Sequence, residues 1–160
     1  MHRILTARRH GFTLVEAFST LAVVGTLAAF AIPRFVDTTG FESRGFYDRA
    51  QNVVRHAQKI AIAQRRSLPA TPVYVVVSAN AMQVCYDSAC TSPVTDAASG
   101  QPLAITTPNA VTLSPVTTFS FDGGGAPSVG SRLALNVNSS GAGDINRTFY
   151  VEATTGYVHE

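Results

Sequence analysis

Charged residues and metal-binding residues are scarce in this chain of 160 residues. Asp, Glu, Lys and Arg make up 14% of the sequence and hydrophobic residues 46%, so the chain is more apolar and less charged than an average soluble domain. Its two cysteines cannot complete a tetrahedral metal site alone, and its four histidines are scattered along the sequence. We therefore expect neither a metal site nor a cofactor.

The sequence also lacks a recognisable catalytic set. His56 and His159 lie in no nucleophile setting, and Ser128 does not have the G-x-S-x-G spacing of a nucleophile elbow. The glycines at 123–125 open no helix, so they predict a tight turn with positive φ rather than a phosphate-binding loop. We expect a protein that is not an enzyme.

Much of the apolarity is concentrated near the N-terminus. Residues 12–32 form a run of 21 residues in which Glu16 is the single charge, and a helix of that length spans roughly the 30 Å core of a bilayer. Arg3, Arg8 and Arg9 precede the run, which predicts a cytoplasmic N-terminus and a periplasmic C-terminal domain. Because these three arginines account for the net charge of +2, that charge is no argument for nucleic-acid binding.

A helix is expected from residue 12 to about residue 66, with two interruptions. Pro33 lacks a backbone N–H and crowds the preceding turn, so it should kink or open the helix, and Gly40 weakens it again. Thr39 and Glu42 then have the spacing of a capping box, which predicts a new start. The helix after it is amphipathic, with apolar residues at intervals of three and four: Phe46, Ala50, Val53, Val54, Ala57, Ile60 and Ala61.

The opposite face of this second helical segment is largely basic, carrying Arg49, Asn52, Arg55, His56 and Lys59. Such a stripe could contact nucleic acid. It has no interleaved aromatic residues, however, and an aspartate at 48 lies within it, so a solvated outer face is the favoured interpretation.

Beyond Pro69 the pattern changes to short β-rich runs separated by Gly, Pro, Asn and Ser. The expected strands are residues 73–78, 82–86, 103–106, 111–113, 117–121, 132–138, 147–153 and 157–159. Their close spacing predicts antiparallel hairpins, and the alternation of Leu133, Leu135 and Val137 gives an apolar face suited to covering the helix. The expected fold class is α+β, with a long N-terminal helix packed on an antiparallel β-sheet domain.

The two cysteines, Cys85 and Cys90, have four residues between them in a segment of small polar residues. If the domain is periplasmic, a disulfide that closes a short loop is the favoured interpretation. A reduced pair and a metal-bound pair are the alternatives.

The carboxylate inside the apolar run distinguishes it from an ordinary secretory signal, because a carboxyl group at membrane depth needs a partner or a function. The residues Gly11-Phe12-Thr13-Leu14-Val15-Glu16, after a short basic leader, resemble the cleavage motif of type IV prepilins. The resemblance implies that prepilin peptidase cuts between Gly11 and Phe12, that the new Phe12 amino group is methylated, and that Glu16 acts in filament assembly. Pro33 matches the helix-breaking proline of the family.

Later segments resemble a narrower class, the minor pilins of the pseudopilin H (GspH/FimT) type, and especially those of the mannose-sensitive haemagglutinin (MSHA) pilus. The segments are residues 45–48, 57–66, 119–123 and 150–158. Some members of the class bind DNA through a basic C-terminal segment, but the last thirty residues here hold only Arg132 and Arg147 as basic residues. The resemblance implies a leader at 1–11, a transmembrane and filament-core helix at 12–39, and a periplasmic globular domain at 40–160.

The expected function is that of a minor type IV pilin or pseudopilin, with prepilin peptidase, other pilin subunits and the inner membrane as partners. Alternatives are a type II secretion pseudopilin, a DNA-uptake subunit, or an adhesive tip subunit that binds a surface ligand through the loop of Cys85 and Cys90 or the connection at 97–102. A further alternative is a conventionally exported soluble periplasmic domain, because Ala29-Phe30-Ala31 fits an A-x-A cleavage site.

Overall fold

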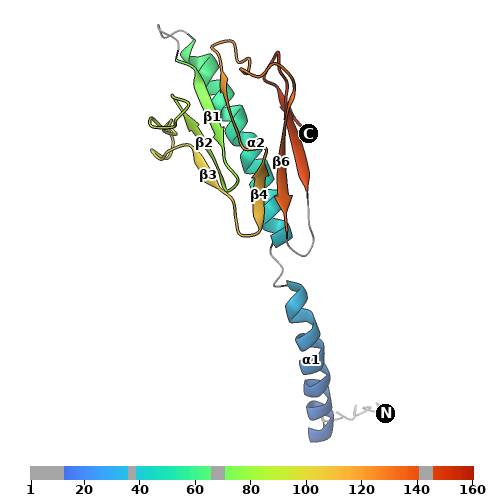
Figure 1. Cartoon of the computed structure of the whole chain (residues 1–160). Coiled ribbons are helices and arrows are strands. Elements are labelled where there is room, and N and C mark those ends of the chain that lie inside the picture. The colour runs from blue at the N-terminus through green and yellow to red at the C-terminus, as the bar shows by residue number, and fades with distance from the viewer. Residues whose placement is uncertain (1–12, 36–38, 66–70, 141–145) are drawn as a thin grey trace, which may run out of the picture. The chain divides into compact units, whose positions relative to one another are not determined.

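The chain divides into two compact units, Met1–Asp37 and Thr38–Glu160 (Figure 1). The computed structural model describes residues 13–35, 39–65, 71–140 and 146–160, with the backbone alone described at 31–35 and 39–40.

The first unit contains one helix, α1 (Leu14–Phe35). It begins where the hydroxyl of Thr13 accepts a hydrogen bond from the Glu16 N–H at 3.3 Å, as an N-cap does. It ends two residues after Pro33, and the next helix begins at Thr39, but residues 36–38 between the two helices lie outside the described residues. Within the described residues, no helix combines the length and the apolarity that a membrane span requires.

The second unit begins with α2 (Thr39–Gln64), whose start confirms the helix restart expected there. Its apolar stripe faces inward as the periodicity predicts: Phe46, Ala50, Val53, Val54, Ala57 and Ala61 are buried, and Ile60 is partly buried. Tyr47 is buried beside this stripe, with its hydroxyl donating to the Thr148 carbonyl at 3.2 Å and its ring edge-on to Phe149. The helix therefore carries a broader buried face than the spacing alone indicated.

The strands form two antiparallel sheets of four strands each, in agreement with the expected α+β fold class. The first has the order β3-β2-β1-β5, with β1 (Val73–Val77), β2 (Ala81–Cys85), β3 (Ala104–Thr106) and β5 (Thr117–Phe121). The second has the order β4-β6-β7-β8, with β4 (Val111–Ser114), β6 (Leu133–Ser139), β7 (Arg147–Val151) and β8 (Val158–His159). All eight expected strands are present within two residues of the predicted bounds.

The expectation of hairpins holds for only part of the chain. β1 pairs with β2, β6 with β7, and β7 with β8, but β5 returns to pair with β1 and β4 pairs with β6. The chain thus changes sheets on both sides of β4. Local alternation shows which face of a strand is apolar, but it does not fix which strand becomes its neighbour.

The core lies between α2 and the two sheets (Figure 1). Strands of both sheets contact the helix. Alternate residues of each strand point into it: Val73, Val75 and Val77 from β1, Leu135 and Val137 from β6, and Phe149 and Val151 from β7. Burying each such side chain contributes about 1.5–3 kcal/mol. The second unit therefore has a hydrophobic core of its own.

Candidate assembly helix and recognition surfaces

The surface of α1 is apolar on all sides and exposed in the single chain. The exposed apolar side chains, which run from Leu14 at 86% to Phe30 at 80%, are Leu14, Val15, Phe18, Leu21, Val23, Val24, Leu27 and Phe30. At 100° per residue these positions surround the helix axis. A helix that is hydrophobic all round is normally buried, in a core or in a membrane. The helix by itself therefore leaves a large apolar surface uncovered.

The hydroxyl groups of α1 are hidden in the helix itself. Ser19, Thr20 and Thr26 each donate to the backbone carbonyl three residues earlier, at 2.9, 2.9 and 2.8 Å. Such bonds are the usual way in which hydroxyls are accommodated within an apolar helix. Among residues 14–30 of α1, whose side chains are described, only Glu16 then presents a strongly polar group to its surroundings.

Glu16 is exposed, and no described cation lies within ion-pair distance of its carboxylate. It stands at the third position of the helix, three residues after Thr13, which is the spacing of a capping box. A negative charge in the first turn also interacts favourably with the helix dipole. Local structure thus gives Glu16 a role that the sequence analysis missed, although the Thr-x-x-Glu spacing was visible.

The residues of the expected processing site, Gly11 and Phe12, lie outside the described residues, as does the side chain of Pro33. The backbone of residues 29–31, which would form the alternative A-x-A cleavage site, is helical and lies within α1.

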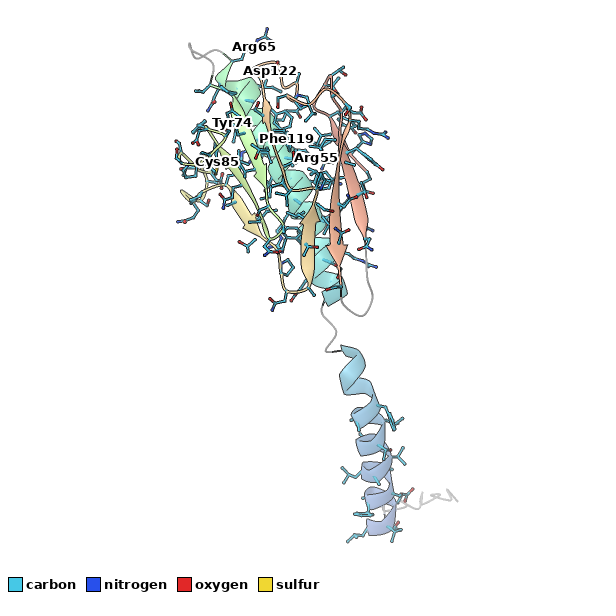
Figure 2. All side chains as sticks on the ribbon, viewed as in Figure 1. Arg55, Arg65, Tyr74, Cys85, Phe119 and Asp122 are labelled. Carbon is cyan, nitrogen blue, oxygen red and sulfur yellow. A yellow bond between two sulfur atoms is a disulfide. The ribbon has the colours of Figure 1, made fainter. Side chains whose placement is uncertain are left out.

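Cys85 and Cys90 form the expected disulfide, with Cα atoms 5.1 Å apart (Figure 2). The loop between them is further fixed by Asp87, whose carboxylate accepts from the N–H groups of Thr91 at 2.9 Å and Ser92 at 2.7 Å. These backbone hydrogen bonds, that of Thr91 first, lower the pKa of Asp87. The loop is therefore held in one conformation, as a recognition loop on a rigid scaffold would be.

The connection at 97–102 is closed by another aspartate. Asp96 accepts from the Ser99 hydroxyl at 2.8 Å and from the Ala98 N–H at 3.3 Å, and these bonds, that of Ser99 first, lower the pKa of Asp96. The expected glycine turn is built in the same manner, because Asp122 accepts from the N–H groups of Gly124 and Ala126 at 2.8 and 2.9 Å. Gly125 has the positive φ expected of that run, 83°.

The basic face of α2 surrounds a shallow hollow of about 350 Å³ lined by Asn52, Arg55, His56 and Lys59. Arg55 is the most constrained of these residues, because its guanidinium donates to the Val158 carbonyl of β8 at 3.1 Å (Figure 2). Part of this face therefore holds the last strand in place.

A cluster on the second sheet was not foreseen. His159 Nε2 lies 2.8 Å from a carboxylate oxygen of Glu152, and the His159 ring stacks on Tyr157 with ring centres 5.5 Å apart. The Arg132 guanidinium lies 4.4 Å from the centre of the Tyr150 ring, which in turn lies beside His159. The hydrogen bond to Glu152 raises the pKa of His159. Among the described residues, no three His, Cys, Asp or Glu side chains gather as a metal site.

Comparison with known proteins gives one similar curated sequence. No family model matches the chain. Over 62 residues it is 39% identical to the type IV narrow pilus major component PilA5 of Thermus thermophilus, a match that covers 39% of this chain and 53% of that protein. The chain thus spans about half the length of its curated relative.

Among solved structures, two crystal forms of the type IV minor pilin FimU of Pseudomonas aeruginosa are similar. The identities are 12% and 13%, the TM-scores 0.47 and 0.48, and the matches cover 78% and 81% of this chain and 90% of FimU. The name of the curated relative describes a filament component. The chain is thus similar, over 62 residues, to a type IV pilus component.

Proposed function

We propose that this chain is a type IV pilus subunit, cut after Gly11 and assembled into the filament through α1. The observation that carries the proposal is the exposed surface of α1, which is apolar on all sides and has hydroxyls satisfied within the helix. Such a surface requires an apolar covering. The inner membrane would provide it before assembly, with the C-terminal domain in the periplasm, and neighbouring α1 helices would provide it in the filament.

Glu16 favours a filament over a permanent membrane anchor. A carboxylate in a membrane helix is costly, by about 2.5–3.5 kcal/mol at the helix centre on insertion scales. Glu16 stands in the first turn of α1 rather than at its centre, and whatever cost it has there persists while the charge has no partner. In a bundle of processed subunits, the new amino group of Phe12 of one chain can pair with Glu16 of the next. Two groups that are costly in lipid would then neutralise each other.

The remaining roles follow the prepilin motif. Prepilin peptidase would cut between Gly11 and Phe12, the Phe12 amino group would be methylated, and Pro33 would allow the helix to bend as it packs. Intact mass of the mature chain tests the first two roles. We expect a chain that starts at Phe12 with one added methyl group, whereas a start at Ile32 would identify a conventional signal-peptidase cut after Ala31.

Replacement of Glu16 tests assembly. Glu16→Ala should be processed and bound to the membrane but absent from sheared filaments. Glu16→Gln separates the two roles of the side chain, because glutamine also serves in a capping box but carries no charge. We expect Glu16→Gln to be absent from sheared filaments as well.

Glu42→Ala is the matched control, since Glu42 is an exposed acid in the first turn of α2. It should assemble normally. Normal assembly of Glu16→Gln would show that the charge pair is not needed, and normal assembly of Glu16→Ala would contradict the role of Glu16 altogether.

We further propose a minor position in the filament, in the pseudopilin H class, on the segments that resemble this class. The sequence relative is named as a major component, so this position needs its own test. Quantitative mass spectrometry of purified filaments should find far fewer copies of this chain than of the dominant pilin. Equal or greater abundance would make it a major subunit.

A further inference from the structure

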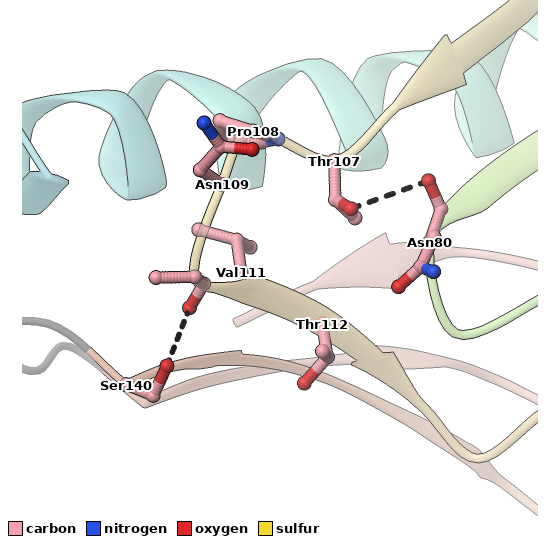
Figure 3. Close-up of a pocket in the computed structure, with 8 residues that line it drawn as sticks. Asn80, Thr107, Pro108, Asn109, Val111, Thr112 and Ser140 are labelled. Atoms are coloured by element: carbon pink, nitrogen blue, oxygen red, sulfur yellow. Dashed lines mark hydrogen bonds between the residues drawn. The ribbon is translucent and has the colours of Figure 1, made fainter.

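A second candidate site lies where the two sheets are joined. The Ala79 carbonyl, after β1, accepts from the Leu113 N–H of β4 at 2.8 Å, which links the two sheets directly. Beside this link is a pocket of about 320 Å³ whose walls come from the β1–β2 turn, the β3–β4 connection, β4 and the end of β6 (Figure 3). The site is thus assembled from four parts of the chain.

The walls of this pocket are held by backbone hydrogen bonds. The Asn80 carbonyl accepts from the N–H and the hydroxyl of Thr107 at 2.9 and 3.2 Å, and the Ala110 carbonyl accepts from the N–H and the hydroxyl of Ser140 at 2.9 and 3.3 Å (Figure 3). Ala110 has a φ of 64°, a left-handed conformation that is unfavourable for a residue with a Cβ. Strained residues of this kind concentrate at ligand sites, where the surrounding structure maintains them.

The pocket offers polar groups without charge. The side-chain amides of Asn80 and Asn109 and the hydroxyl of Thr112 make no hydrogen bond within the described part of the chain. An amide provides two donors and an acceptor, and the hydroxyls of Thr107 and Ser140, which donate inward, keep lone pairs to accept with. None of the described residues that line the pocket is ionisable.

This lining selects among classes of ligand. A charged ligand would lose water without gaining a counter-charge, and an apolar ligand would leave the amides of Asn80 and Asn109 unpaired. The hydroxyl groups of a neutral sugar each donate and accept, which matches amide and hydroxyl groups, while Pro108 and Ala110 offer apolar surface to its C–H groups. The volume is near the lower end of known ligand pockets, which suits one or two sugar rings.

We propose that this pocket binds a neutral saccharide of one or two rings. The inference goes beyond filament assembly and does not depend on it, because every residue it uses lies in the second unit. Asn109, the exposed amide on the β3–β4 connection, is the side chain best placed to determine specificity.

The test uses the full chain in micelles of a phosphocholine detergent, since glycoside detergents would present sugars themselves. Saturation-transfer NMR is recorded with glucose, galactose, N-acetylglucosamine and maltose, and with glucuronic acid as the charged match. We expect at least one neutral sugar to bind and glucuronic acid to bind less well than glucose. No signal from any neutral sugar, or stronger binding of glucuronic acid than of glucose, would overturn the proposal.

Matched substitutions locate the binding. Asn109→Asp keeps the shape but adds a charge and removes two donors, so affinity should fall about tenfold, the equivalent of roughly one hydrogen bond. Asn80→Asp should also lower the affinity for the sugar. Asn52→Asp, an exposed asparagine of α2 outside the pocket, is the control and should bind like the unmodified chain. Unchanged affinity in both pocket variants, or an equal loss in the control, would contradict the assignment.

The two proposals fail independently. Glu16→Ala should keep full sugar binding while losing assembly, and Asn109→Asp should assemble while losing sugar binding. Loss of sugar binding in Glu16→Ala would show that the signal comes from somewhere other than this pocket.

Discussion

The two helices have similar lengths, but the apolar residues of α2 are buried and those of α1 are exposed. α1 has 22 residues with apolar side chains on every side, and α2 has 26 residues with a single apolar stripe. The stripe of α2 is buried against the sheets, whereas Leu14 to Phe30 remain exposed. The comparison shows that α2 completes a fold within its own unit, whereas α1 leaves its apolar surface exposed.

The largest difference between the helices should appear on removing one phenylalanine from each. Phe46→Ala takes a fully buried ring out of the core and should lower the free energy of unfolding by about 3–5 kcal/mol. Phe18→Ala removes a ring that is 72% exposed and should leave that free energy nearly unchanged. Chemical denaturation in micelles can be followed by tyrosine signals, because all five tyrosines lie in the second unit. Equal losses in the two variants would contradict the comparison.

The next largest loss of stability is expected on substituting Gly156, in the β7–β8 turn. Its φ is 65°, and a Cβ there would collide with the Gly125 carbonyl and the amide nitrogen of Gln58. That amide donates to the carbonyls of Gly125 and Thr155 at 3.0 and 2.8 Å and so ties both turns to α2. Gly156→Ala should destabilise the second unit by about 2–4 kcal/mol.

Gly130→Ala provides the control for this glycine, because nothing lies within 4 Å of the position that its Cβ would take. Its midpoint of denaturation should match that of the unmodified chain. If Gly156→Ala were as stable as Gly130→Ala, the turns would not be packed as described.

Loss of the disulfide should have a moderate effect on the second unit alone. Cys85→Ser with Cys90→Ser removes a closure of a short loop, for which chain entropy gives about 2 kcal/mol. The midpoint of denaturation should fall accordingly, while incorporation into filaments at permissive temperature should persist. An unchanged midpoint would show that Asp87 and its hydrogen bonds hold the loop alone.

The smallest effect should be a dependence on pH at the C-terminus. Glu152 raises the pKa of His159, so the stabilisation of the β7–β8 pair is fully present below the ordinary histidine pKa of 6.5 and is lost as pH rises through the higher folded value. The other groups beside the ring are Glu160, Arg132, Tyr150 and Tyr157. An NMR titration should give a His159 pKa above that of His159 in Glu152→Gln. The same value in both would exclude the pair as the cause.

The helices and strands of this fold could be predicted from the sequence, because the periodicity of each element is a local pattern. The stripe from Phe46 to Ala61 predicted α2, and the alternation around Leu135 predicted β6. The division into two sheets could not be predicted from local periodicity, because the pairing of β5 with β1 is a contact between distant segments. The pair of His159 with Glu152 was missed for a related reason, since it forms only when a turn brings β8 beside β7.

For the candidate sites too, features made by neighbouring residues could be predicted from the sequence, and features made by distant segments could not. The assembly roles that the motif from Gly11 to Glu16 implies stay a prediction, whereas Cys85 and Cys90 were correctly expected to pair. The pocket at the junction of the sheets was not foreseen, because Asn80, Asn109 and Ser140 come together only once both sheets have formed.

The most direct test of the account is to identify what touches α1 in the filament. A photoreactive phenylalanine analogue in place of Phe18 is activated in purified filaments, with the same analogue in place of Tyr157 as an exposed comparison on the second unit. We predict that the Phe18 position forms adducts with the N-terminal helix of another pilin subunit, as identified by mass spectrometry. Adducts with lipid alone, or none, would contradict the claim that neighbouring subunits cover α1.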